Sequence, residues 1–188
     1  MKKTVRIVYA YARTDDPSIG CFGKGDGLPW PHNKQDMKNF IASTRGATLL
    51  MGANTFRSLP SLLPGRSHVV MSGRSRGETI RTKDGCVPSR IVNGSFDQII
   101  DELKLEMSTD LICVIGGASI IIQAIPFADE IHETEIYGRF EHDVTINLNE
   151  LRKAKVNGEF NLHETHEYLL HGITQRVYKN EKIFKQTN

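Results

Sequence analysis

The chain has 188 residues, a length typical of one well-packed domain and short for two. Hydrophobic residues make up 39%, which is enough for a core and excludes a disordered chain. The 24 Lys and Arg against 22 Asp and Glu give a net charge of +2. This balance disfavours nucleic acid as a partner, but a local basic patch could still bind a small phosphorylated molecule.

Three cysteines, Cys21, Cys86 and Cys113, cannot all pair, and no CxxC spacing is present to bind zinc. We therefore expect structural thiols in a reducing cytoplasm and no metal site. The apolar stretch at the N-terminus is broken by Arg6 and Arg13, which disfavours a signal peptide. Residues 111–128 are uncharged, but they contain two Gly and a Pro and fall short of the ~20 apolar residues that cross a bilayer.

The predicted elements alternate between strands and helices. Residues 4–12 are rich in Val, Ile and Tyr and predict a strand, whereas residues 20–27 (GCFGKGDG) predict a flexible loop. Apolar residues at helical spacing predict a helix over 33–44. Further along we expect strands at 47–51, 66–72, 91–92, 111–115 and 131–137, helices at 55–58, 95–105 and 118–125, and a hairpin over 164–178. This order predicts a single α/β domain, 1–188, whose sheet is mostly parallel with an antiparallel edge.

Two segments share one design, in which a buried strand is followed by glycine and then a helix. They are TLLMGANT (48–55) and ICVIGGAS (112–119). The first N–H groups of a helix lack partners, and glycine lets a phosphate approach the backbone, so the pair suits the pyrophosphate of a dinucleotide. Alternatively, the glycines only permit tight turns. Neither GxGxxG nor GxxxxGK[ST] is present.

The order of several further motifs is more specific. GKGDGLPW ends at Trp30, Asp36 follows six residues later, and MGxxTF (51–56), LPGR (63–66) and VIGG (114–117) come after it. Together they closely resemble the dihydrofolate reductase family, with good register from Val5 to Thr145. The sequences GDGLPW and LLPGRSH are most similar to those of phage-encoded members. The resemblance implies the three-layer fold of that family, with a mostly parallel central sheet, an antiparallel C-terminal edge hairpin and helices on both faces.

The resemblance also implies an activity, the NADPH-dependent reduction of 7,8-dihydrofolate to 5,6,7,8-tetrahydrofolate in support of thymidylate synthesis and one-carbon metabolism. Asp36 matches the acid that orients the pterin and supports protonation of N5 through water. Trp30 matches the residue that covers the pocket and holds this water, Leu28 the mobile loop that closes over the nicotinamide, and Thr134 the partner of the acid. Alternatively, Asp36 is an ordinary acid in the first turn of a helix.

By the same resemblance, Arg66 binds the α-carboxylate of the glutamate tail through its planar pair of donors. The implied substrate contacts are Val8, Tyr9, Asp36, Met37, Phe40, Leu59, Leu63, Arg66, Ile115 and Thr134. The implied NADPH contacts are Ala10, Gly23, Lys24, Gly52, Ala53, Asn54, Thr55, Ser72, Gly73, Arg74, Ile115, Gly116, Gly117, Ala118, Ser119 and Ile120. The Gly116–Gly117 bond matches a cis peptide of the family.

Three positions depart from the family pattern. Ala53 stands where a basic residue usually reaches the cofactor phosphates, Ile121 where many members have a tyrosine beside the nicotinamide, and Ser61 where some members have a second arginine. We expect Arg74 or Arg76 to bind the 2′-phosphate of NADPH in place of the missing cation, unless both are solvated loop charges.

Two alternative functions are a pyrimidine reductase of flavin synthesis and a structural or interaction protein that keeps the fold. The Asp36 spacing and the PGR motif disfavour the pyrimidine reductase. The expected partners are dihydrofolate and NADPH, without nucleic acid or membrane, in a monomer or homodimer. The expected location is the cytoplasm, or the host cytoplasm if the chain is encoded by a phage.

Overall fold

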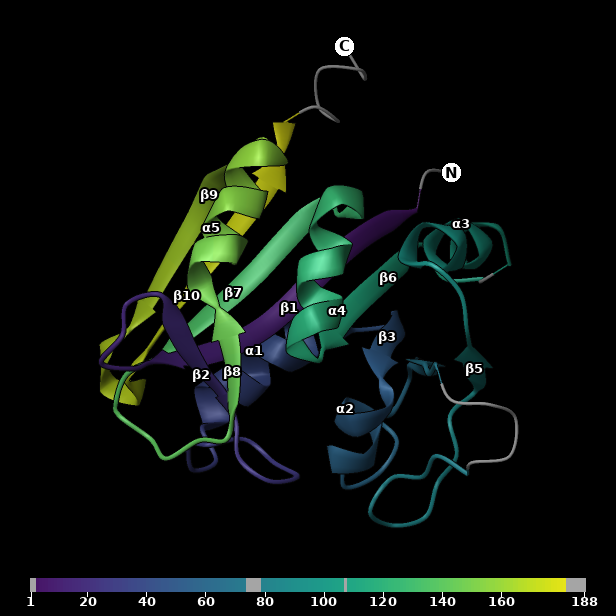
Figure 1. Ribbon diagram of the computed structural model, residues 1–188, viewed down its shortest axis with the longest axis horizontal. Coiled ribbons are helices and arrows are strands. Elements are labelled where there is room, and N and C mark those ends of the chain that lie inside the picture. Colours follow the sequence, from purple (N-terminus) through teal and green to yellow (C-terminus); the bar gives the residue numbers. More distant parts are fainter. Residues whose placement is uncertain (1–2, 74–78, 107, 182–188) are drawn as a thin grey trace.

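A single mixed sheet organises the protein, which is described by a computed structural model over residues 3–73, 79–106 and 108–181. Its strands follow the order β5-β4-β3-β6-β1-β7-β10-β9, with β2 paired to β1 and β8 paired to β2 (Figure 1). The strands are β1 (Thr4–Arg13), β2 (Ile19–Gly23), β3 (Thr48–Gly52), β4 (Ser67–Met71), β5 (Arg90–Val92), β6 (Leu111–Gly116), β7 (Glu130–Ile136), β8 (Val144–Asn147), β9 (Phe160–Tyr168) and β10 (Ile173–Asn180). The run from β5 to β7 is parallel, and β10 and β9 are antiparallel, as predicted from the sequence.

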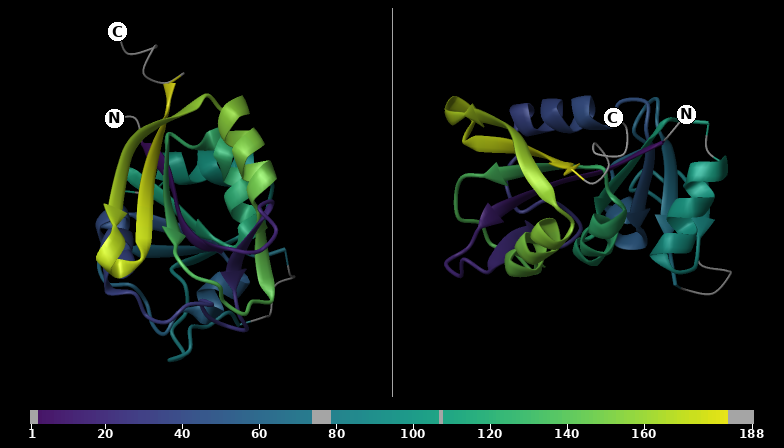
Figure 2. Two further views of the ribbon diagram at one scale, coloured as in Figure 1. Left: turned by 90° about the vertical axis from the view of Figure 1, so that its left-hand side faces the viewer. Right: turned by 90° about the horizontal axis from the view of Figure 1, so that it is seen from above.

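Helices cover both faces of this sheet. They are α1 (Lys34–Thr44), α2 (Ala53–Ser58), α3 (Phe96–Glu106), α4 (Ala118–Ala124) and α5 (Leu148–Asn157). Ile100 of α3, Ile121 of α4 and Leu151 of α5 pack into one buried cluster, whereas Phe40 of α1 and Phe56 of α2 pack into another. Figure 2 shows α1 on one side of the sheet and α4 and α5 on the other. The predicted three-layer arrangement is confirmed.

The start of α1 is fixed by a side-chain cap. The Oδ1 atom of Asn33 accepts a hydrogen bond from the backbone N–H of Asp36 at 3.1 Å, which satisfies one of the donors that a first turn leaves unpaired. The Nδ2 atom of Asn33 donates to the carbonyl of His171 at 2.7 Å, in the turn between β9 and β10. This contact places the first turn of α1 beside the C-terminal hairpin.

The prediction of a flexible loop over 20–27 is partly wrong, because residues 19–23 form β2. This strand pairs with both β1 and β8. A Cβ atom on Gly20 would lie 2.9 Å from Cγ2 of Ile146, so glycine is required here for close packing between strands. The glycine at this position therefore marks a close approach of the backbone to a neighbouring strand, and not flexibility.

Strand β8 and helix α5 were not predicted from the sequence. The apolar positions of α5 are sparse, with Leu148 and Leu151 buried and Ala154 half-buried. A usable signal was the cap, since Oδ1 of Asn147 accepts a hydrogen bond from the backbone N–H of Glu150 at 2.9 Å.

Cys21, Cys86 and Cys113 are free, and the first and last are buried. No described helix has the length and apolar character needed to cross a lipid bilayer. Within the described ranges, no group of three or more His, Cys, Asp or Glu side chains is arranged to hold a metal ion.

Candidate active site

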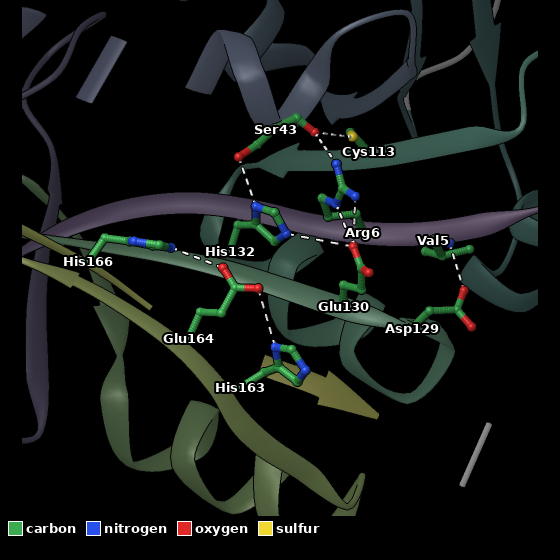
Figure 3. A network of polar contacts seen from close by, with 10 residues as sticks. All are labelled: Val5, Arg6, Ser43, Cys113, Asp129, Glu130, His132, His163, Glu164 and His166. Carbon is green, nitrogen blue, oxygen red and sulfur yellow. Dashed lines mark hydrogen bonds and ion pairs between the residues drawn. The ribbon is translucent and has the colours of Figure 1, made fainter. Parts of the chain in front are cut away.

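Helix α1 places Asp36 over strand β7. The Oγ atom of Ser43, seven residues after Asp36, lies 2.8 Å from Nδ1 of His132 (Figure 3). Seven residues return a helix to the same face after about 10.5 Å, so Asp36 shares the face of Ser43 that is turned to the sheet. Thr134 follows His132 by two residues and lies on the same face of β7. Since α1 begins beside the turn before β10, Asp36 lies toward the Thr134 end of this strand.

The other end of α1 is anchored by a charged network (Figure 3). Arg6 Nε and Nη2 lie 2.8 and 2.7 Å from Oε2 of Glu130, and Arg6 Nη1 donates to the carbonyl of Ser43 at 2.6 Å. Cys113 Sγ lies 3.5 Å from the same carbonyl. Contacts with His132 and Arg6 hold the pKa of Glu130 at about 2, so this carboxylate stays ionised. The network fixes the helix against β1, β6 and β7.

The carboxyl group of Asp36 has an unusual protonation equilibrium. Its side chain is half-buried, and burial raises its pKa to about 6, although the nearby His32 favours the charged form. The group is therefore mostly ionised at pH 7 but can take up a proton close to neutrality. A strongly shifted acid of this kind is typical of a functional site.

Trp30 lies on the same side of the sheet. Its side chain is buried with Ala10 and Ile136, and its ring meets Phe140 edge-on at 6.2 Å between centroids. The buried Nε1–H of Trp30 has no acceptor among the described residues. A buried indole N–H ordinarily has a partner, so this donor suits a water or ligand atom.

Five of the apolar residues predicted as substrate contacts lie together, and we call them the apolar wall. One cluster contains Val8, Phe40, Leu59, Leu63 and Ile115. Met37 is 38% exposed and lies outside this cluster. Tyr9 is a correction, because its side chain lies on the opposite face of the sheet, where its hydroxyl donates to the buried carboxylate of Glu133. Neighbouring residues of a strand point to opposite faces, so the Tyr9 side chain cannot join Val8 in the wall.

Arg66 lies next to the end of α1 that is remote from Asp36. Its Nη1 donates to Oγ1 of Thr44 at 3.1 Å, while its buried Nε has no acceptor among the described residues. Burial lowers the pKa of Arg66. An unsatisfied guanidinium donor suits a carboxylate, which accepts from two N–H groups at once. An acid therefore lies at one end of α1 and an arginine at the other, with the apolar wall between them.

A separate cavity of about 300 Å³ lies where β3, β4 and β6 end. Both strand–glycine–helix segments contribute to it, and its lining residues are Gly52, Ala53, Asn54, Thr55, Arg57, Met71, Ser72, Gly73, Gly117, Ser119 and Ile120. A Cβ atom on Gly52 would lie 3.0 Å from Cδ1 of Ile120 and 3.7 Å from the backbone N of Gly117, so the two segments pack closely at this glycine. The Gly116–Gly117 peptide bond is cis, as predicted.

The cavity brings some of the predicted cofactor residues together and not others. Every lining residue except Arg57 and Met71 was among them, and no motif of the family pointed to these two. Ala10 and Ile115 lie in the clusters around Trp30 and Val8, and Gly116 and Ala118 flank Gly117 without lining the cavity. Gly23 and Lys24 lie at the end of β2, away from the lining, and Lys24 forms an ion pair with Glu141. Leu28, in the connection between β2 and α1, is 59% exposed. Arg74 and Arg76 lie outside the described residues.

Comparisons with known proteins agree on one family. The family model described as dihydrofolate reductase matches residues 6–172. Dihydrofolate reductase type 8 of Escherichia coli is 31% identical over 150 residues, which cover 79% of this chain and 86% of that protein. Type 9 of Escherichia coli is 32% identical over 142 residues (74% and 77%), and the Bacillus subtilis enzyme is 31% identical over 121 residues (64% and 65%).

A solved structure supports the fold. Dihydrofolate reductase from Enterococcus faecalis, complexed with NADP(H) and RAB-propyl, superposes with a TM-score of 0.72 at 19% identity, covering 94% of this chain and 95% of that one. The family match spans the strand that carries Val8, the helix that carries Asp36 and both glycine segments of the cavity. The chain belongs to the dihydrofolate reductase family.

Proposed function

We propose that Asp36 binds and orients the pterin ring in the reaction of this family, the reduction of 7,8-dihydrofolate to 5,6,7,8-tetrahydrofolate by NADPH. The observation that carries this role is the half-buried Asp36 carboxyl, whose pKa is raised to about 6 and which lies on the sheet side of α1 toward Thr134. An ionised carboxylate accepts hydrogen bonds from the 2-amino and N3 side of a pterin. The Thr134 hydroxyl is the proposed donor that orients this acid.

The rest of the substrate matches the polarity of the site. Phe40, Leu59 and Leu63 offer an apolar surface for the aminobenzoyl group, together with Val8 and Ile115. Arg66, beside Thr44, would take the α-carboxylate of the glutamate tail through its unsatisfied Nε and one neighbouring N–H. A ligand with an amino-pyrimidine head and a carboxylate tail therefore suits the two ends of α1.

Delivery of a proton to N5 of the pterin is the second task of the site. Trp30 covers the pocket and has a buried N–H without an acceptor among the described residues, which suits it to hold a water molecule near Asp36. The Asp36 carboxylate stabilises the positive charge that builds up when N5 is protonated. Leu28 is the proposed residue that closes the connection between β2 and α1 over the site and excludes bulk water.

NADPH supplies the hydride. The residues of the cavity fit it, since the glycines leave the backbone accessible and Thr55 and Ser119 add hydroxyl donors. Ile115 belongs to the apolar wall and directly precedes the glycines at 116 and 117, and Ala10 packs in the cluster around Trp30; both are proposed to adjoin the reactive end of the cofactor. The role of the chain is to hold this end beside the pterin.

The proposed partners are these two small molecules, with no nucleic acid, because the net charge is only +2. We also propose a cytoplasmic protein that acts as a monomer or homodimer, and size-exclusion chromatography with light scattering would distinguish these two states.

The test of the reaction is the loss of NADPH absorbance with dihydrofolate as substrate. We expect turnover with dihydrofolate and none with the aminopyrimidine substrate of flavin synthesis. A folded protein that binds neither NADPH nor dihydrofolate would contradict the proposal, and turnover of the aminopyrimidine alone would favour the pyrimidine reductase.

A further inference from the structure

The cofactor cavity lacks a cation at position 53 but has one at position 57. Among the described residues that line the cavity, Arg57 alone carries a charged side chain. Ala53 and Arg57 stand four residues apart in α2, so they lie on one face of the helix, one turn apart. A long arginine side chain one turn further on can thus serve the same part of the cavity.

The direction of Arg57 follows from its neighbour Thr55. A Cβ atom on Gly116 would lie 3.2 Å from Oγ1 of Thr55, so Thr55 is turned toward the end of β6. Two residues further along a helix, the side chain points about 200° away. Arg57 is therefore turned toward the opposite side of the cavity, where Met71 ends β4 and Ser72 and Gly73 follow it.

The guanidinium makes a contact at this wall with a residue of the same helix. Nη1 of Arg57 donates to Oδ1 of Asn54 at 3.2 Å, and Asn54 also lines the cavity. A guanidinium carries its N–H donors in one plane, so this contact orients the plane at the wall of the cavity.

The position of the site along the sheet identifies the phosphate. Thr134, the proposed partner of the pterin-binding Asp36, lies on β7 next to β1, whereas Arg57 is turned toward β4, and β6 and β3 lie between β4 and β1. With neighbouring strands ~4.8 Å apart, β4 lies ~14 Å from β1. The nicotinamide must lie at the β1 side to reach the pterin, so the opposite end of the cofactor, the adenosine ribose with its 2′-phosphate, lies at the β4 side.

We propose that Arg57 binds the 2′-phosphate of NADPH and sets the preference of this enzyme for NADPH over NADH. The inference rests on the proposed binding of NADPH in this cavity. The phosphate is dianionic near neutrality, and a planar guanidinium donates to two of its oxygens at once. Neither the motifs nor the family pattern points to Arg57. It would supply the positive charge for the phosphate that the Ala53 side chain lacks.

Equilibrium titration of the folded protein with each nucleotide, without substrate, tests the proposal. Arg57→Ala should weaken NADPH binding about 10- to 100-fold, the range for a lost hydrogen bond to a charged group, and change NADH binding less than about two-fold. The effect should shrink as salt rises. In competition, 2′-AMP should lose affinity for the variant while 5′-AMP does not.

Arg152→Ala is the matched control, because Arg152 makes the same contact to an asparagine three residues earlier, with Nη1 2.9 Å from Oδ1 of Asn149, on the remote helix α5. It should leave both affinities unchanged. Arg57→Lys should keep part of the preference, because the charge stays while the two-pronged contact is lost. Adding Ala53→Arg to Arg57→Ala should restore part of the preference. If Arg57→Ala does not fold, the Arg57→Lys variant still tests the proposal, since an unchanged preference would overturn it.

The outcomes distinguish the proposed function from the role of Arg57. A wild-type protein that does not bind NADPH contradicts the proposed function. Wild-type preference for NADPH that persists in Arg57→Ala overturns the inference alone, as does an equal loss for both nucleotides, which would place Arg57 on the pyrophosphate or on the fold.

Discussion

The ammonium group of Lys155, on α5, lies 2.8 Å from the carboxylate of Glu133. Glu133 precedes Thr134 in strand β7, so its side chain points to the opposite face of the sheet. Only 12% of the Lys155 side chain and 6% of the Glu133 side chain are exposed. Tyr9 and Tyr178 also donate to Glu133, and burial together with this carboxylate raises the pKa of both hydroxyls. The polar cluster therefore ties α5, β1, β7 and β10 together on the face opposite the candidate site.

Replacement of Lys155 by Met should destabilise the protein. It leaves Glu133 buried without its cation, and loss of one partner of a buried pair costs about 3–5 kcal/mol of the free energy of unfolding. Urea unfolding at pH 7 measures the change. Lys153→Met, at an exposed position of the same helix, is the control and should have little effect. Equal effects of the two variants would mean that the Lys155–Glu133 pair adds nothing to stability.

Asp36→Asn tests the catalytic role. The amide keeps the shape of the side chain but removes the negative charge, so turnover of dihydrofolate at pH 7 should fall at least ~100-fold. Part of the loss should be recovered at low pH, where solvent protonates the substrate directly. The measurement is the pH profile of turnover for both proteins, and near-native turnover of the variant at neutral pH would exclude the role.

Asp36→Asn should lower turnover but raise the stability of the folded protein. Burial raises the pKa of Asp36 from 3.8 to about 6, so the folded state binds more protons than the unfolded state between these values. The ionised group therefore costs stability that is absent below about pH 4 and fully present above about pH 6. We expect Asp36→Asn to gain stability relative to the wild type as pH rises through this window. Urea midpoints at pH 4 and pH 7 provide the check, and a gain that does not grow with pH would contradict burial of the charge.

Ionisation of Glu130 affects stability in the opposite direction to ionisation of Asp36. The pKa of Glu130 lies at about 2 against a usual 4.5, so it stabilises the folded state above about pH 4.5, and this contribution is lost as pH falls toward 2. Glu130→Gln should lower the free energy of unfolding at pH 7 by ~1.5–3 kcal/mol, as expected for a hydrogen bond between charged groups. The difference from the wild type should vanish in acid. Glu141→Gln, in an exposed pair with Lys24, should leave stability nearly unchanged at both pH values.

Local patterns predicted much of this arrangement because they act at short range. The helical spacing of apolar residues located α1, and with it the position of Asp36 in its first turn. The two strand–glycine–helix segments located the cavity, because both contribute residues to its lining. The family resemblance then gave these positions a chemistry that their spacing alone leaves open.

Other features depend on contacts that no local pattern carries. The direction of Arg57 follows from Thr55 packing toward Gly116, which lies about sixty residues further along the chain. The Glu133–Lys155 pair joins a strand to a helix that was not predicted from the sequence. Tyr9 was different, since the alternation of a strand already indicated that Val8 and Tyr9 point to opposite faces.

Arg66→Leu tests the contact to the carboxylate tail. The substitution removes both the unsatisfied Nε donor and the contact to Thr44, so dihydrofolate should bind ~10- to 100-fold more weakly, the range for a hydrogen bond to a charged group. A pterin without the glutamate tail should bind the variant and the wild type equally in a fluorescence titration, because Asp36 and the apolar wall remain. Arg45→Leu, at the exposed end of α1, controls for the lost charge. Equal losses for both ligands would mean that Arg66 supports the fold and does not bind the tail.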